Sequence, residues 1–498
     1  MRFFHCRALL MAGGALLALA ACSQDLTIPN TNDPSFTDVV STPADVAKLA
    51  KSAINTWHDA NNEVTPAMSQ AVMADALSGG YNNFGMNLSS HEPRMAIQNV
   101  TTAGDYTAMV QDPWDRNYKA LSEANDVLRA LAGGMVIDDD ATTESYKALA
   151  MLTQGLALGN IALIFDRGFI VDENTKIPAP VSSLTSHQDV EAAALAKLDA
   201  AIALAQGKSW TLPHDALPVA GIDLTADNIA KIANTMAARI VAYSPRNSQE
   251  NQAADWAKVL QYAQNGISSG AAPFDLAIQE DNGTLWWDGL KAYGDYGPWL
   301  RVDMRIMHEI NPKLPTEYTS CSSIPEDSVG VQDARYWTDF TYIAKIPNWC
   351  ARGVWHYSNW EYSRYGTKAV NGDVSWYSGT FTGVAPLVLA AENDLLEAEA
   401  LVRTGGDLNL AANLVNKTRV GRGKLPPVTA DPTALLDAIH YEQDVELLTT
   451  GAGLAWYNRR RIDGLQAGTP RQFPIPAHEL ETDGLPSYTF GGPDNPDM

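Results

Sequence analysis

Apolar residues recur at helical spacing through most of the first 270 residues. This pattern predicts a series of helices: one that begins at Pro43, then residues 66–77, 112–131, 143–166, 187–205, 226–243 and 251–268. Thr42 and Asp112 are the predicted N-caps of the first and third helices, because each is followed by a proline at the first helical position. The helices follow one another in pairs with short connections, which is typical of tetratricopeptide-like helical-hairpin repeats.

The pattern changes between Trp286 and Tyr377. This stretch holds eight of the 13 tryptophans and nine of the 18 tyrosines, interleaved with glycine, proline, asparagine and aspartate. No long helical period survives there, so we expect loops with a few short strands. Helical spacing returns at residues 385–403, 408–419 and 432–448, and the tail from Thr469 is expected to be extended. The predicted fold class is therefore all-α dominated, a helical-hairpin scaffold with a loop-rich, aromatic-rich region that faces a ligand.

The first 21 residues resemble an export signal. Arg2 and Arg7 precede an apolar stretch that is too short for a good membrane span, and Leu19-Ala20-Ala21-Cys22 has the pattern of a lipobox. We expect cleavage before Cys22, lipidation of its thiol with acyl chains such as palmitate, and a polar tether over residues 22–42. The alternative is an ordinary secretory signal in which the cysteine is coincidental.

Composition and charge narrow the possible partners. The chain is 46% hydrophobic, as in ordinary globular proteins, and carries a net charge of −23. Such an acidic surface repels nucleic acid and anionic headgroups, so membrane attachment would come from the lipid alone. Cys321 and Cys350 are expected to form a disulfide after export, the alternative being two buried thiols. Their spacing does not suggest a zinc site, and we expect no metal or cofactor.

The catalytic motifs HExxH, SxxK, GxxxxGK[ST] and GxGxxG are absent, and the spacing GxSxG occurs once, at Gly266-Ile267-Ser268-Ser269-Gly270. We therefore expect no enzymatic activity, although a pair of carboxylates could in principle form a glycosidase site. The aromatic concentration suggests ligand binding instead, because indole and phenol faces offer large contact areas to sugar rings. A second candidate is the Gly/Asn-rich turn with Tyr81, Asn82 and Asn83, followed by Arg94. The alternatives are aromatics that only build a core and an ordinary turn.

Several segments together resemble the SusD/RagB family of outer-membrane nutrient-binding lipoproteins. They are Leu26 to Pro34 after the lipobox, Trp114 to Asn125, Ala148 to Phe165, Pro386-Leu387 with Glu392 and Glu399, Glu442 to Tyr457, and Phe473-Pro474-Ile475-Pro476 with Glu479-Leu480. The last is the most specific. Leu389 and Ala390 replace the family's Arg-Tyr, four residues separate Gly451 from Trp456, and Asn458 stands where Asp is usual. These departures indicate a divergent branch.

The resemblance implies a scaffold with residues 43–270 as an N-terminal helical region and 271–498 as a C-terminal region, which is loop-rich over 271–384 and helical over 385–463. It also implies a lipid anchor in the outer membrane, exposure at the cell surface, an oligosaccharide or other oligomeric nutrient as ligand, and a SusC-like TonB-dependent transporter as partner. The ligand-binding residues that the resemblance implies are Asp75, Asn82, Asn83, Arg94, Trp286, Trp287, Tyr293, Tyr296 and Trp299. Tyr81, from the Gly/Asn-rich turn, completes the predicted set. Two rival interpretations are a glycan-degrading lipoprotein enzyme and a non-binding envelope scaffold.

Overall fold

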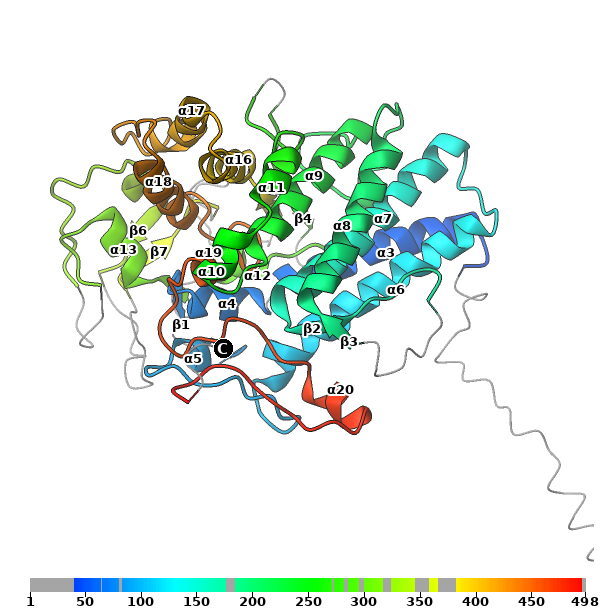
Figure 1. The fold of residues 1–498 in the computed structure, drawn as a ribbon, viewed down its shortest axis with the longest axis horizontal. Coiled ribbons are helices and arrows are strands. Elements are labelled where there is room, and N and C mark those ends of the chain that lie inside the picture. Colours follow the sequence, from blue (N-terminus) through cyan, green and yellow to red (C-terminus); the bar gives the residue numbers. More distant parts are fainter. Residues whose placement is uncertain are drawn as a thin grey trace, which may run out of the picture. The chain divides into compact units, whose positions relative to one another are not determined.

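Nine helices of the compact unit Thr42–Met498 pack one against the next in a curved row (Figure 1). In chain order they are α3 (Pro43–Asn62), α6 (Asp112–Ala132), α7 (Asp140–Ile164), α8 (His187–Ala205), α9 (Ala226–Tyr243), α11 (Trp256–Ala263), α16 (Ala390–Thr404), α17 (Leu408–Arg419) and α18 (Pro432–Val445). The computed structural model describes residues 40–63, 65–79, 83–175, 184–270, 273–281, 285–294, 300–316, 324–344, 358–365 and 382–494. The predicted helix-dominated, tetratricopeptide-like fold is thereby confirmed.

Local capping explains where several of these helices begin. The Thr42 hydroxyl accepts from the backbone N–H of Asp45 at 3.3 Å, and the Asp45 carboxylate accepts from the Thr42 N–H at 3.0 Å. This capping box satisfies donors that the helix itself leaves unpaired. The predicted N-cap at Thr42 is confirmed, and three predicted helices, 187–205, 226–243 and 408–419, have the observed bounds.

Other predicted boundaries were wrong. The predicted helix 66–77 ends at Met73 and gives way to strand β1 (Leu77–Gly79), because Asp75 takes a left-handed backbone with φ of 52°. The predicted helix 251–268 is two helices, α10 (Ser248–Ala253) and α11, since Asp255 caps a new start. Asp112 is not an N-cap, because the π-helical turn η1 (Thr107–Gln111) runs directly into α6.

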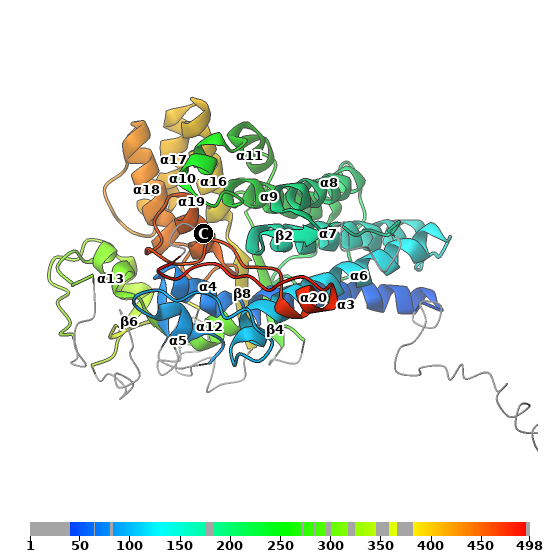
Figure 2. The ribbon, with the colours of Figure 1, turned by 60° about the horizontal axis from the view of Figure 1, so that its bottom comes forward.

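Short helices and strands surround the row. Within the described ranges the strands form four antiparallel pairs: β1 with β5 (Leu300–Val302), β2 (Arg167–Phe169) with β3 (Leu184–Ser186), β4 (Leu276–Asp281) with β8 (Thr382–Val388), and β6 (Phe340–Tyr342) with β7 (Trp360–Tyr362). The other helices are α4 (Ala67–Met73), α5 (Met86–Ser90), η3 (His214–Ala216), α12 (Gly289–Gly294), α13 (Met304–Ile310), α14 (Arg335–Thr338), α19 (Leu454–Arg461) and α20 (Ala477–Thr482). In Figure 2, α4, α5 and α12 lie together below α16 to α19.

Strand β8 corrects another prediction, since residues 385–388 were expected to begin a helix. These residues pair with β4, so that Ala385 lies opposite Ile278. Both side chains are buried. The pairing of β4 with β8 therefore connects the beginning of the predicted loop-rich region, 271–384, to its end.

Two buried ion pairs hold helix α16, one against α9 and one against α19. Arg239 on α9 holds both oxygens of Glu392 on α16, at 2.7 and 2.6 Å. Arg461 on α19 holds both oxygens of Glu399 at 2.7 and 2.6 Å, and both of these side chains are 0% exposed. The acidic residues of the family-like segment at 386–400 thus fix the packing of α16 against α9 and α19.

The segment Phe473-Pro474-Ile475-Pro476 closes the end of α7. The Phe473 N–H donates to the carbonyl of Ile164 at 2.7 Å, and its own carbonyl accepts from Asp166 N–H at 3.0 Å. The rings of Phe165 and Phe473 meet edge to face with centroids 6.2 Å apart. These contacts give a structural role to the segment that most specifically resembles the family, because Phe473 attaches it to the end of α7.

Helix α7 is long and apolar enough to cross a membrane, and it alone passes that test within the described part of the chain. However, 83% of its most apolar stretch is buried inside the protein, against α6, α8 and α9. It therefore has the environment of a core helix.

Candidate functional site

Strands β1 and β5 pair with each other, and each is adjacent in the sequence to one of the two candidate segments. Gly79, the last residue of β1, lies opposite Leu300, the first residue of β5. In the sequence, the Gly/Asn-rich turn begins directly after Gly79, and Trp299, the last of the predicted ligand-binding aromatics, directly precedes Leu300. Seven predicted residues lie outside the described residues: Cys22, Tyr81, Asn82, Tyr296, Trp299, Cys321 and Cys350.

Asp75 and Arg94 are both predicted ligand-binding residues, and the structure pairs them with each other. The Arg94 guanidinium donates to the Asp75 carboxylate, to Thr469 Oγ1 at 3.1 Å and to the carbonyl of Ser89. The side chains of Asp75 and Arg94 are 6% and 2% exposed. From the other side, Arg305 Nε donates to the carbonyl of Asp75 at 3.0 Å. The pair therefore positions the turn that leads into β1.

The described aromatic residues of this region differ in burial. Trp286 is buried, and its ring meets that of His58 on α3 with centroids 5.2 Å apart. Trp287 and Tyr293 are half-buried and meet edge to face with centroids 5.7 Å apart. Asn55 on α3 donates to the carbonyl of Leu285, which fixes the start of the segment. Trp286 thus belongs to the core, whereas part of Trp287 and Tyr293 is accessible.

Asn83 is exposed and lines an open groove of about 470 Å³. The other lining residues are Glu63, Thr65, Phe84, Gly104, Asp105, Thr107, Ala108, Asp112 and Arg116. Arg116 on α6 forms an ion pair with Glu63 at the end of α3. Burial raises the pKa of the Asp112 carboxyl, while Arg116 opposes the shift. Sequence reasoning identified Asn83 but missed its charged neighbours, which come from three separate elements.

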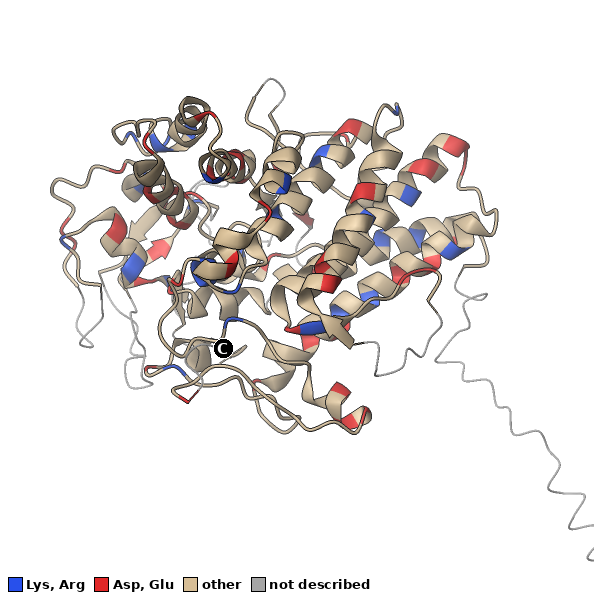
Figure 3. Ribbon diagram, viewed as in Figure 1, with Lys and Arg blue, Asp and Glu red and all other residues tan. Residues whose placement is uncertain are grey.

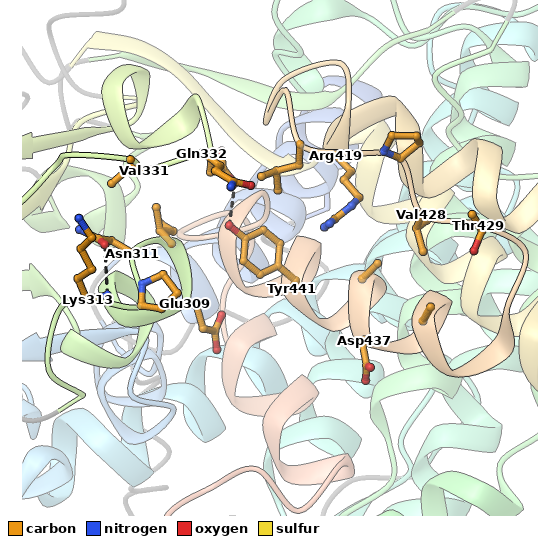
Figure 4. Close-up of a pocket in the computed structure, with 18 residues that line it drawn as sticks. Glu309, Asn311, Lys313, Val331, Gln332, Arg419, Val428, Thr429, Asp437 and Tyr441 are labelled. Atoms are coloured by element: carbon orange, nitrogen blue, oxygen red, sulfur yellow. Dashed lines mark hydrogen bonds between the residues drawn. The ribbon is translucent and has the colours of Figure 1, made fainter.

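A larger cavity of about 780 Å³ lies between the end of α13 and the face of α18 (Figure 4). Figure 4 shows Glu309, Asp437, Arg419 and Tyr441 arranged around it. None of its lining residues also lines the Asn83 groove. Sequence reasoning missed this cavity. Asp437 and Tyr441 share a helix face at i and i+4, but the spacing alone does not distinguish a cavity wall from a solvated face.

One group of side chains has the composition of a divalent-cation site among the described residues. His478 Nε2 lies 3.3 Å from Asp115 Oδ1 and 3.4 Å from Glu479 Oε1. The Tyr106 hydroxyl is 2.9 Å from His478 Nδ1 and fixes the ring. All three side chains are substantially exposed, so the same arrangement also serves as an ion pair when the histidine is protonated.

Charge is distributed without a basic patch in the view of Figure 3, where Lys and Arg alternate with Asp and Glu along the helices.

Comparison of the sequence with protein-family models finds no match, and comparison with curated proteins finds none either. Solved structures, however, match over most of the chain. A SusD homolog from Bacteroides thetaiotaomicron has a TM-score of 0.61 and 16% identity, covering 89% of this chain and 97% of its own. SusD-like carbohydrate binding proteins from Bacteroides fragilis and Bacteroides vulgatus have TM-scores of 0.57 and 0.54, each at 15% identity. Both matches cover 84% of this chain, together with 86% of the Bacteroides fragilis protein and 83% of the Bacteroides vulgatus protein. The chain therefore has the SusD fold.

Proposed function

We propose that this protein is a divergent SusD/RagB-family lipoprotein that binds a glycan and delivers it to a SusC-like TonB-dependent transporter. The pairing of β1 with β5 is the observation that supports the proposal, because these strands are adjacent in the sequence to the Asn-rich turn and to the predicted aromatics at 286–299. Two of the solved proteins with this fold are described as SusD-like carbohydrate binding proteins, which supports the ligand class.

The proposed site combines ring faces with hydrogen-bonding groups. Trp287 and Tyr293 would contact the apolar face of a sugar, since aromatic rings provide much contact area with few rotatable bonds. Asn83, together with Asp105 and Arg116 in the groove, would exchange hydrogen bonds with hydroxyls. Asp75 and Arg94 act as positioning residues in this proposal, because their charges already satisfy each other.

Binding assays on single variants test the site. A panel of defined plant and microbial oligosaccharides is titrated calorimetrically into the wild type and into Trp287→Ala and Asn83→Ala variants. The loss of an aromatic anchor should weaken binding more than about tenfold. Trp337→Ala is the matched control, since Trp337 is 59% exposed but lies on α14. If both variants bind like the wild type, the site is elsewhere; if no oligosaccharide binds, the ligand class is wrong.

The proposed anchor is the lipid on Cys22, with the protein at the surface of the outer membrane. A Cys22→Ser variant should lose labelling by a fatty-acid analogue and leave the membrane fraction. Affinity purification of the tagged wild type from native outer membranes should recover a TonB-dependent transporter in stoichiometric amount. Recovery without any transporter would contradict the delivery step.

The proposal is of binding without catalysis. Prolonged incubation with the oligosaccharides that bind should leave their chain lengths unchanged. Shortened products that disappear in an Asp or Glu variant would instead support a glycan-degrading enzyme.

A further inference from the structure

One cluster outside the Asn83 groove brings an imidazole and two carboxylates to a common point. His478 and Glu479 lie in the first turn of α20, whereas Asp115 lies in α6, far earlier in the chain. His478 Nε2 is 3.3 Å from Asp115 Oδ1 and 3.4 Å from Glu479 Oε1, and the three atoms all lie within 4.8 Å of one another. The three groups therefore converge, and none of them lines the groove.

The separations between these atoms fit the geometry of a bound zinc ion. In tetrahedral zinc sites the bonds to imidazole nitrogen and carboxylate oxygen are about 2.0–2.1 Å long, so two ligand atoms lie about 3.3–3.4 Å apart. An N–H···O hydrogen bond is usually shorter, with its donor and acceptor about 2.9–3.0 Å apart. Both distances from His478 Nε2 to the carboxylate oxygens thus match the ligand spacing of a tetrahedral site.

The His478 ring is held from its other nitrogen. Tyr106 is 1% exposed, and its hydroxyl lies 2.9 Å from His478 Nδ1. The same hydroxyl accepts from the backbone N–H of His478 at 2.9 Å. Histidines that bind metal generally donate their second ring N–H to a fixed acceptor, which sets the tautomer and the ring orientation. When Nδ1 carries the proton, Tyr106 accepts it and the Nε2 lone pair faces the two carboxylates.

Asp115 is held in a similar way. Its Oδ2 accepts from Gln111 Nε2 at 3.1 Å, one helical turn earlier, which leaves Oδ1 for an ion. In the part of the chain that the structure describes, no lysine or arginine forms an ion pair with Asp115 or Glu479. A protonated imidazole would offset only one of these two negative charges, whereas a divalent cation offsets both.

Partial exposure gives an ion access to the cluster. The side chains of Asp115, His478 and Glu479 are 43%, 29% and 31% exposed. An ion can therefore enter from solvent, and a water molecule can take the fourth position of a tetrahedral site. The imidazole favours zinc over calcium and magnesium, because the latter two ions prefer oxygen ligands alone.

We propose that Asp115, His478 and Glu479 bind a Zn²⁺ ion, with water as the fourth ligand, and that this ion holds α20 against α6. The inference does not depend on the proposed function. The sequence did not suggest a metal site because the closely spaced ligands of a zinc motif are absent. Only the meeting of α20 with α6 completes the ligand set.

Calorimetric titration of zinc chloride into the purified protein, freed of metal with a chelator, tests the site. The wild type should bind one zinc ion per chain. His478→Gln and Asp115→Asn should bind zinc at least about tenfold more weakly because each removes a ligand, and Tyr106→Phe should lose about tenfold because the ring is no longer held. Glu481→Gln is the matched control and should bind zinc like the wild type, since Glu481 is exposed on the same helix but accepts from Thr101.

Two further measurements locate the ion. Zinc should raise the midpoint of thermal unfolding of the wild type and of Glu481→Gln, but not that of His478→Gln. In crystals soaked with zinc chloride, anomalous scattering at the zinc absorption edge should place the ion between the three side chains. Circular dichroism of the metal-free proteins shows whether each variant folds, and the crystal of the wild type decides if one does not.

The site is refuted if the wild type binds no zinc, if His478→Gln and Asp115→Asn both bind it like the wild type, or if the anomalous peak lies elsewhere. Calcium or magnesium binding as tight as that of zinc would overturn the assignment of the imidazole as a ligand. An equal loss in Glu481→Gln would show that the negative surface attracts the ion without specific ligands. None of these results bears on sugar binding in the Asn83 groove, so the proposed function is tested separately.

Discussion

Breaking the buried pair between Glu399 and Arg461 should destabilise the protein strongly. Both side chains are 0% exposed, and the two hydrogen bonds are 2.7 and 2.6 Å long. At an effective dielectric constant of about 20, charges this close attract by about 6 kcal/mol. Much of that attraction offsets the cost of removing both charges from water.

Removing only one partner leaves the other charge buried. Arg461→Met would leave Glu399 with Arg403 at 2.8 Å as its nearest cation. Glu399→Leu would leave Arg461 with amide oxygens, including Asn458 Oδ1 at 2.7 Å. Glu399→Leu should therefore lose about 3–5 kcal/mol of unfolding free energy, and Arg461→Met, which leaves Glu399 paired with Arg403, should lose less. The double variant, which buries no unpaired charge, should lose less than the sum by about 1–3 kcal/mol.

Urea unfolding followed by tryptophan fluorescence measures this cycle. The exposed pair Lys231–Asp227, 2.7 Å apart on α9, provides the control: Lys231→Met should change stability by less than about 1 kcal/mol. Losses for the two single variants that add up in the double variant to within about 0.5 kcal/mol would refute the reasoning. The same conclusion would follow if Arg461→Met cost no more than Lys231→Met.

Three further predictions follow from single contacts. Burial raises the pKa of Glu399, but Arg461 opposes this and the net pKa is lowered, so the pair's contribution to stability is fully present above pH ~4.3 and is lost as the pH falls through the folded value. The difference between the urea midpoints of wild type and double variant should therefore shrink from about pH 7 to about pH 3. A constant difference would contradict this prediction. Thr42→Ala should lower the unfolding free energy by about 1 kcal/mol through loss of the capping box, whereas Thr42→Ser should restore it in the same assay. Gly453→Ala should lower the temperature of thermal unfolding more than Gly484→Ala, because both glycines have positive φ but only at Gly453 would a Cβ lie 2.6 Å from Tyr457. Equal decreases would show that φ alone decides the loss of stability.

Helix positions were largely predictable because the signals are local. The helix His187–Ala205 begins where Ser186 caps it and runs as far as the helical spacing of alanine and leucine continues. Thr42 and Pro43 likewise determine the start of α3 without help from the rest of the chain. In such segments, the residues that decide the conformation lie within a few positions of one another.

The short strands β5, β6 and β7 lie in the stretch where a few were expected, but the strand β8 was missed, because its partner is remote. Residues 385–388 carry apolar side chains that suit either a helix or a strand, and the pairing with residues 276–281 makes them a strand. Asp255 shows the opposite case, in which a single local cap divides a predicted helix in two. A periodic pattern indicates which side of an element is buried, but not which distant segment buries it.

The sequence by itself determined that this protein is a helical scaffold with an aromatic-rich middle, because hydrophobic period and turn residues act locally. The sequence also indicated residues that could contact a ligand, such as Asn83 and Trp287. Only the tertiary structure decided that Asp75 and Arg94 neutralise each other and that Trp286 is buried. It alone placed Asp437 on a cavity wall. The physical reason is that pairing of charges and exposure of rings depend on residues that are separated in the chain, by 19 positions for Asp75 and Arg94 and by 228 for His58 and Trp286, and packing decides which of them meet.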